Sequence, residues 1–302
     1  VTGVAGKHGI EIAASGVTLD LNGFALVGVS GSLDGVSTTA GNLANIAVVN
    51  GSARTWGDEG VDLGTISAIN CRVEGVLAFA NTGNGISVGS GCTVTNCSAA
   101  FNAVNGISTS TGCTVSQCTA AFNTVNGINA GSGCTVTNCS ASVNAGSGIS
   151  TISGCAVSNC AGYNNDGNGI ITDAGCTVAD CSARYNILDG IRCSNACVIR
   201  GNSCMESSAG SGNGSAGIHT TGDKNRIEGN NCTAGDRGIG VDLAGNIIIK
   251  NTCSGNTIDW VLVANNVFGP IIDRRAPASA AVSGFAAASS LGSTDPNANF
   301  SY

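Results

Sequence analysis

The strongest constraint on the fold is a spacing of 21 residues between cysteines in the middle of the chain. One column of cysteines keeps this interval, and a second column keeps it five residues further on. The first column contains Cys71, Cys92, Cys113, Cys134, Cys155, Cys176 and Cys197. The second contains Cys97, Cys118, Cys139, Cys160 and Cys181. Residues at a fixed period indicate that the chain is built from copies of one structural unit.

Asparagine and glycine keep the same interval. The asparagine column contains Asn81, Asn102, Asn123, Asn144, Asn165 and Asn186. The dipeptide Gly-Ile recurs at Gly85, Gly106, Gly127, Gly148, Gly169 and Gly190. Because Asn and Gly favour turns, each unit contains its own chain reversals. We interpret the asparagine column as stacked side chains that hydrogen-bond from unit to unit and tolerate unusual backbone angles.

Within one unit the sequence has the alternation of a strand. Cys92-Thr93-Val94-Thr95 alternates apolar and polar residues, so Cys92 and Val94 point inward and the threonines outward. Short strands joined by turns predict the coils of a β-solenoid, in which each coil must stack on its neighbours. We predict a single right-handed parallel β-helix of about eleven coils over residues 1–269. Residues 270–302 lack the repeat and are expected to form a C-terminal tail that caps the helix or contacts another subunit.

Three stretches of the sequence support this fold by their resemblance to known proteins. GVTLDLNGFAL, NDGNGIITDAGCTV and STDPNANFSY resemble bacterial right-handed parallel β-helix repeat proteins of the pectate-lyase-like superfamily. The resemblance covers nearly the whole chain and implies an exported protein, extracellular or at the cell surface. It implies little about activity, since this fold carries lyases, hydrolases, adhesins and proteins without known activity.

Charge and hydropathy exclude several partner classes. The chain has 12 Lys+Arg against 19 Asp+Glu and no basic stripe, so we expect no nucleic-acid partner. No apolar run reaches the roughly 20 residues that a membrane helix needs. The sequence opens directly into a predicted strand, as that of a mature exported chain or of a trimmed chain would.

The cysteines allow three interpretations. A ladder of buried thiols that act as small apolar side chains is favoured. Disulfides between stacked coils are the alternative, because neighbouring strands lie about 4.8 Å apart and an exported protein can form them. A metal site is disfavoured because the C-x4-C spacing is not that of a zinc finger and the chain has only two histidines, His8 and His219. We therefore expect neither a metal nor another cofactor.

Charged residues concentrate between residues 189 and 237. In coil register Arg192 and His219 share a column, and Arg200 stacks one coil before Glu228. If the protein is catalytic, Arg192, His219 and Glu228 are the candidate catalytic residues. An earlier acidic cluster contains Asp58, Glu59, Asp62 and Glu74. Surface ion pairs and charged turns are commonplace and are the favoured explanation of both groups.

Three functions remain open, and the balance leans away from an enzyme. The leading hypothesis is a non-catalytic exported structural protein that self-associates end to end, because the coils between 85 and 165 carry no charged residue. The alternative is a polysaccharide lyase or glycoside hydrolase that acts in an outer groove near residues 189–237. The third is ice binding through the outward Thr93-x-Thr95 and Thr135-x-Thr137 columns.

Overall fold

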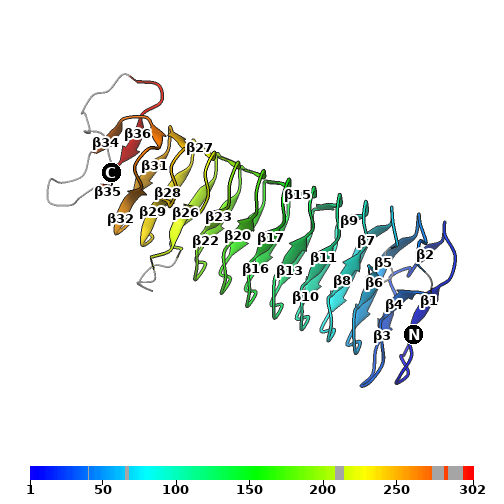
Figure 1. Ribbon diagram of the computed structural model, residues 1–302. Helices are drawn as coiled ribbons and strands as arrows, with labels where there is room; N and C mark the ends of the chain where they lie inside the picture. Colours follow the sequence, from blue (N-terminus) through cyan, green and yellow to red (C-terminus); the bar gives the residue numbers. More distant parts are fainter. Residues whose placement is uncertain (40, 65–67, 208–213, 274–281, 285–294) are drawn as a thin grey trace. The chain divides into compact units, whose positions relative to one another are not determined.

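The computed structural model describes residues 1–39, 41–64, 68–207, 214–273, 282–284 and 295–302. The chain divides into two compact units, Val1–Cys155 and Ala156–Tyr302, and each is described by itself. The described residues form strands and turns without a helix, which confirms a parallel β-solenoid of about eleven turns with a period of about 21 residues. Within each unit, strands with the same place in the coil lie side by side (Figure 1). No described helix is long and apolar enough to cross a membrane.

Unit 1 contains two sets of parallel strands. The first set, here called the GI sheet of unit 1, consists of strands next to the glycine markers. These strands are β1 (Ile10–Ile12), β4 (Val36–Thr38), β6 (Val61–Leu63), β8 (Ile86–Val88), β11 (Ile107–Thr109), β14 (Ile128–Ala130) and β17 (Ile149–Thr151). The second sheet of unit 1 contains β2 (Thr18–Asp20), β3 (Ala25–Val27), β5 (Ala47–Arg54), β7 (Arg72–Phe79), β9 (Thr93–Thr95), β10 (Ser98–Ala100), β12 (Thr114–Ser116), β13 (Thr119–Ala121), β15 (Thr135–Thr137) and β16 (Ser140–Ser142).

Unit 2 repeats this division. Its GI sheet contains β20 (Ile170–Thr172), β23 (Ile191–Cys193), β26 (Ala216–Thr220), β29 (Arg237–Val241), β32 (Ile258–Leu262) and β35 (Val282–Gly284). Its second sheet contains β18 (Ala156–Ser158), β19 (Ala161–Tyr163), β21 (Thr177–Ala179), β22 (Ser182–Arg184), β24 (Val198–Arg200), β25 (Ser203–Met205), β27 (Arg226–Glu228), β28 (Asn231–Thr233), β30 (Ile247–Ile249), β31 (Thr252–Ser254), β33 (Val267–Phe268), β34 (Ile271–Asp273) and β36 (Asn299–Ser301).

The core is a stack of like residues on like residues. Ile107 pairs in register with Ile86 on one side and Ile128 on the other, and all three are fully buried. Val94 in the middle of β9 is fully buried, whereas Thr93 and Thr95 are partly exposed, as the alternation predicts. The 21-residue period therefore places each apolar side chain against its copy in the next coil.

Each coil turns at corners where one residue adopts a left-handed backbone conformation. At the corner that leads into Asn102, this residue is Phe101 (φ 58°), and at the corner that leads into Cys97 it is Asn96 (φ 53°). The expectation that the column asparagines themselves take the unusual backbone angles is wrong. The residue before them does, because the asparagine must point inward and bond the neighbouring coil.

The asparagine column forms the expected ladder. The backbone N–H of Asn102 donates to Oδ1 of Asn123 at 3.1 Å, and its side-chain Nδ2 donates to the same oxygen at 3.0 Å. Nδ2 also lies 3.3 Å from the carbonyl oxygen of Ala78. These bonds satisfy backbone groups that a buried corner would otherwise leave unpaired.

All sixteen cysteines are buried free thiols, as the thiol-ladder interpretation predicts. The columns do more than fill space, because the sulfur of Cys113 accepts the backbone N–H of Cys92 at 3.4 Å and lies 3.0 Å from the carbonyl of Gly89. In unit 2 the column of Cys197 continues with Asn225, whose Oδ1 accepts the N–H of Cys197 at 2.8 Å. Cysteine thus takes the place of an asparagine rung.

A second polar ladder, which the sequence analysis missed, occupies the position before each glycine marker. In unit 1 it contains Asp34, Glu59, Asn84, Asn105, Asn126 and Ser147, and in unit 2 Asn168 and Asp189. Here a carboxylate or amide oxygen accepts the N–H of the following coil, as between Asn105 N and Asn84 Oδ1 at 3.1 Å. We call it the pre-glycine ladder. Its direction is opposite to that of the asparagine column.

The described C-terminal residues pair with the solenoid. β36 (Asn299–Ser301) pairs with both β31 and β34, and Asn299 Oδ1 accepts the N–H of Asn251 at 2.9 Å. Ser301 donates a hydrogen bond to the buried carboxylate of Asp259. Phe285 and Pro277, which were expected to belong to a tail, lie outside the described residues.

Candidate functional site

Arg192 and His219 lie side by side on the GI sheet of unit 2. They are register partners, Arg192 in the middle of β23 and His219 one residue before the end of β26, and the strand alternation directs their side chains outward. The shared column expected from the sequence is therefore present. It also gathers two carboxylates, from Asp189, two residues before β23, and from Asp242, which directly follows β29. Asp242 was missed because no sequence marker relates it to His219.

His219 is held between these two carboxylates. Its Nδ1 lies 2.9 Å from Oδ2 of Asp189, and its Nε2 lies 3.0 Å from Oδ2 of Asp242. Burial by itself lowers the pKa of His219, but the hydrogen bond with Asp189 and the charges of both carboxylates outweigh it, so the pKa is raised above 6.5. Because each nitrogen faces an acceptor, the arrangement favours the protonated ring, which donates from both.

The two carboxylates differ in exposure. The Asp189 side chain is 4% exposed, whereas that of Asp242 is 52% exposed. Arg192 is 42% exposed, and its Nη1 lies 3.9 Å from Oδ2 of Asp189. One anionic partner of His219, Asp189, is therefore enclosed by protein and lies near Arg192, and the other, Asp242, is open to solvent.

Arg192 lines two pockets on this face. The first has a volume of about 230 Å³ and is also lined by Leu188, Asp189, Gly214, Ser215 and His219. The second has a volume of about 280 Å³ and is also lined by Ile171, Thr172, Asp173, Cys193, Ser194 and Thr221. Each is smaller than most drug-sized sites, which begin at about 300 Å³, so each would hold one ring rather than a whole oligosaccharide.

Glu228, the third candidate from the sequence, is placed elsewhere. It lies on β27 of the second sheet, where Oε2 accepts from Nε of Arg226 at 2.7 Å and Oε1 from Nζ of Lys250 at 2.9 Å. These two hydrogen bonds, with Lys250 the stronger, lower the pKa of Glu228. Its register partner Arg200 is the one expected. Arg226, Glu228 and Lys250 form a surface ion-pair network, and none of them lines either pocket described above.

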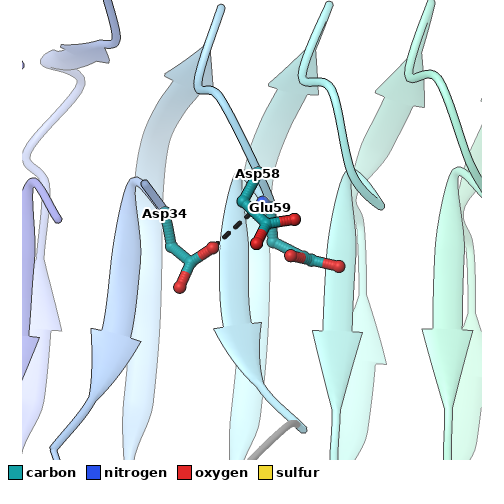
Figure 2. Close-up of side chains that lie close together, drawn as sticks. All are labelled: Asp34, Asp58 and Glu59. Atoms are coloured by element: carbon teal, nitrogen blue, oxygen red, sulfur yellow. Dashed lines mark hydrogen bonds between the residues drawn. The ribbon is translucent and has the colours of Figure 1, made fainter. Parts of the chain in front are cut away.

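The acidic cluster in unit 1 is partly assembled. Asp34, Asp58 and Glu59 bring carboxylate oxygens within 4.8 Å of one another, and Figure 2 shows Asp34 accepting the backbone N–H of Glu59. Oxygen ligands at this separation could hold a hard cation. Burial, helped by Asp58, raises the pKa of Glu59 from 4.5 to about 7. Glu74 instead pairs with Arg72.

Asp34 and Glu59 have a structural explanation as well. Both belong to the pre-glycine ladder, where Oδ1 of Asp34 accepts Glu59 N–H at 3.0 Å and Oε1 of Glu59 accepts from Asn84 Nδ2 at 2.9 Å. His8 lies 3.0 Å from Oδ2 of Asp34. The sequence cluster left out Asp34 because the residue types of this ladder vary from coil to coil.

The threonine columns are in register on unit 1. Thr93 pairs with Thr114 and Thr114 with Thr135, and Ser116 lies between Thr95 and Thr137. The Ser116 hydroxyl donates to Thr95 Oγ1 at 3.1 Å, so these hydroxyls bond each other rather than only water. Ice binding stays a prediction, and thermal hysteresis with ice shaping by the purified protein would test it.

Comparisons with known proteins identify the fold. No family model matches the chain, and no curated protein matches it. Among solved structures, the chain is similar to a periplasmic alginate epimerase, the AlgG T265N mutant (12% identity, 96% of this chain and 76% of that chain, TM-score 0.58). It is also similar to a double-mutant tailspike protein of E. coli bacteriophage HK620 (14% identity, 99% and 71%, TM-score 0.50).

A third likeness is to the A-module of the Azotobacter vinelandii mannuronan C-5 epimerase AlgE6, with 14% identity over 99% of this chain and 91% of that chain, at a TM-score of 0.47. Identities this low indicate a shared fold and do not indicate a shared activity. The predicted resemblance is confirmed at the level of the fold: the chain folds as a parallel β-helix, as the structures with TM-scores of 0.58 and 0.50 do.

Proposed function

We propose that the protein acts on an anionic polysaccharide at the GI sheet of unit 2, with Arg192 and His219 as the reacting pair. The observation that carries the proposal is His219 held between two carboxylates next to Arg192 and a pocket. Structural surface ion pairs rarely combine a buried carboxylate, a histidine of raised pKa and a concave site.

Each residue has a chemical role in this proposal. Arg192 binds a carboxylate of the sugar chain through its planar guanidinium, which withdraws charge from that group. His219, once its Nε2 has lost its proton, is positioned to take the proton from the sugar carbon next to that carboxylate and to pass it to the leaving glycosidic oxygen, so that a C–H and a C–O bond break as a C=C bond forms. Removal of a proton next to a carboxylate begins the reactions of both a lyase and an epimerase, and the alginate epimerase with a TM-score of 0.58 shares the fold of this chain.

The test is incubation of the purified protein with alginate, polygalacturonate and a neutral glucan, with and without Ca²⁺. Ultraviolet absorbance detects elimination, reducing ends detect hydrolysis, and proton NMR detects epimerisation. Arg192→Ala and His219→Ala should abolish any change, whereas Glu228→Gln, on the other sheet, should retain it. A chain that leaves every polymer unaltered and binds none, or an activity that survives in His219→Ala, contradicts the proposal.

A non-catalytic structural role with self-association is the second candidate. One observation favours it: on unit 1 three partly exposed rings form a row, with Phe101 and Phe122 stacked at 4.7 Å and Phe79 at 5.3 Å from Phe101. Residues 85–155, which contain Phe101 and Phe122, carry no charged residue that would repel a second copy, and the register partner of Phe79 is Arg54. Electron microscopy and sedimentation of the wild type and of Phe101→Ser would show whether assemblies, end to end or side by side, form and depend on the row.

A further inference from the structure

Asp189 belongs both to the pre-glycine ladder and to the candidate site around His219. As a member of the pre-glycine ladder, it donates its N–H to Asn168 Oδ1 at 3.1 Å, and its Oδ1 accepts the N–H of Ala216 at 2.7 Å. Its second oxygen, Oδ2, is the one that contacts Nδ1 of His219 at 2.9 Å. One carboxylate oxygen is therefore fixed by the backbone of the next coil, and the other binds the histidine.

Other rungs of the ladder show that the backbone bond does not need a carboxylate. Asn105 Oδ1 accepts the N–H of Asn126 at 3.1 Å, and Asn126 Oδ1 accepts that of Ser147 at 2.9 Å. An amide oxygen suffices there. Asp189 has a second acceptor oxygen, which an asparagine would lack, and this oxygen binds His219.

We propose that Asp189 is a positioning residue that, in the function proposed above, orients His219 so that Nε2 is the atom offered to the substrate. The hydrogen bond from Ala216 fixes the Asp189 carboxylate. The carboxylate in turn fixes the proton on Nδ1 of His219 and the plane of the ring. Asp242 holds Nε2 only in the absence of substrate, because its carboxylate is 52% exposed and its described side-chain contact is the one with His219. Arg192, the register partner of His219 on β23, adds a positive charge next to the ring.

The positioning role predicts different outcomes for two substitutions of Asp189. Asp189→Asn keeps an acceptor for the Ala216 N–H but removes the charge that His219 faces, whereas Asp189→Ala removes both. With only two histidines in the chain, NMR can follow the His219 ring directly, assigned through His8→Asn. The titration and the nitrogen shifts report the pKa and the protonated nitrogen without any substrate.

We expect Asp189→Asn to unfold within about 3 °C of the wild type and Asp189→Ala clearly lower. The pKa of His219 should fall by about one unit or more in Asp189→Asn and by less in Asp242→Asn, whose charge is solvent-screened. An unchanged His219 pKa in Asp189→Asn, or a loss of stability as large as in Asp189→Ala, overturns the inference.

The outcome is separable from that of the proposed function. If no polymer is altered or bound but the pKa of His219 falls in a folded Asp189→Asn, the positioning role stands and the polysaccharide proposal fails. If a polymer is altered by the wild type, a rate at least about tenfold lower in Asp189→Asn, with its pH profile shifted, supports both. An unchanged rate and profile overturn the positioning role alone.

Discussion

Cys92 donates its backbone N–H to the sulfur of Cys113 in the next coil, at 3.4 Å, in the same way that Asn81 donates its N–H to Oδ1 of Asn102 at 3.1 Å. Each acceptor side chain also lies near a carbonyl 24 residues earlier, Gly89 for Cys113 and Ala78 for Asn102. Cysteine and asparagine are therefore alternative solutions to one corner geometry.

This equivalence predicts how Cys113 can be replaced. Cys113→Asn should lower the free energy of unfolding by less than about 1 kcal/mol, because the amide can make both bonds. Cys113→Ala should cost about 2 kcal/mol, because it leaves the N–H of Cys92 without its acceptor and opens a small void. Urea unfolding of the two variants checks the order, and an asparagine variant less stable than the alanine variant contradicts the equivalence.

The free thiols predict a redox-insensitive fold. Protein denatured without reductant should react with a thiol reagent at all sixteen cysteines, and the native protein at almost none, since every thiol is buried. Burial raises the pKa of Cys253, which keeps its thiol protonated and unreactive. A thiol count well below sixteen would show disulfides between coils instead.

Glu59 predicts a pH effect on stability. Because burial raises its pKa from 4.5 to about 7, the folded state binds a proton more tightly than the unfolded state. The Glu59 contribution to the free energy of unfolding should therefore be largest near pH 4.5. It should decrease as the pH rises and be lost once the pH exceeds about 7. Glu59→Gln, which can still accept from Asn84, should be more stable than the wild type at pH 8. Glu11→Gln on the exposed side of β1 is the matched control, and equal stability profiles for Glu59→Gln and the wild type would refute the prediction.

Two glycines of one coil should respond differently to substitution. A Cβ at Gly106 would lie 2.7 Å from both Asn123 Nδ2 and the Gly127 carbonyl, so Gly106→Ala must displace the ladder and should be strongly destabilising. Gly112 has φ +69° and open space around its Cα, and Asn70 adopts φ 54° at the equivalent corner, so Gly112→Asn should be nearly neutral. Thermal unfolding of both variants tests the contrast, and equal losses would be inconsistent with it.

Much of the architecture follows from the sequence because the repeat is local and regular. A period of 21 with apolar residues in alternation leaves only stacked coils as a way to bury Val94 or Ile107. The asparagine and cysteine columns are visible for the same reason, since one residue type recurs at one interval. The register of Arg192 with His219 could also be counted from their glycines.

The carboxylates around His219 and the pre-glycine ladder were decided only by the tertiary structure. The ladder changes residue type from Asp34 to Glu59 to Asn84, so it has no signature other than its place before each glycine. Asp242 follows a different strand from His219, and the two meet only because parallel pairing sets β26 against β29. The charge state of His219 depends on which oxygens surround it and on their burial, and both are properties of packing between coils rather than of any one coil.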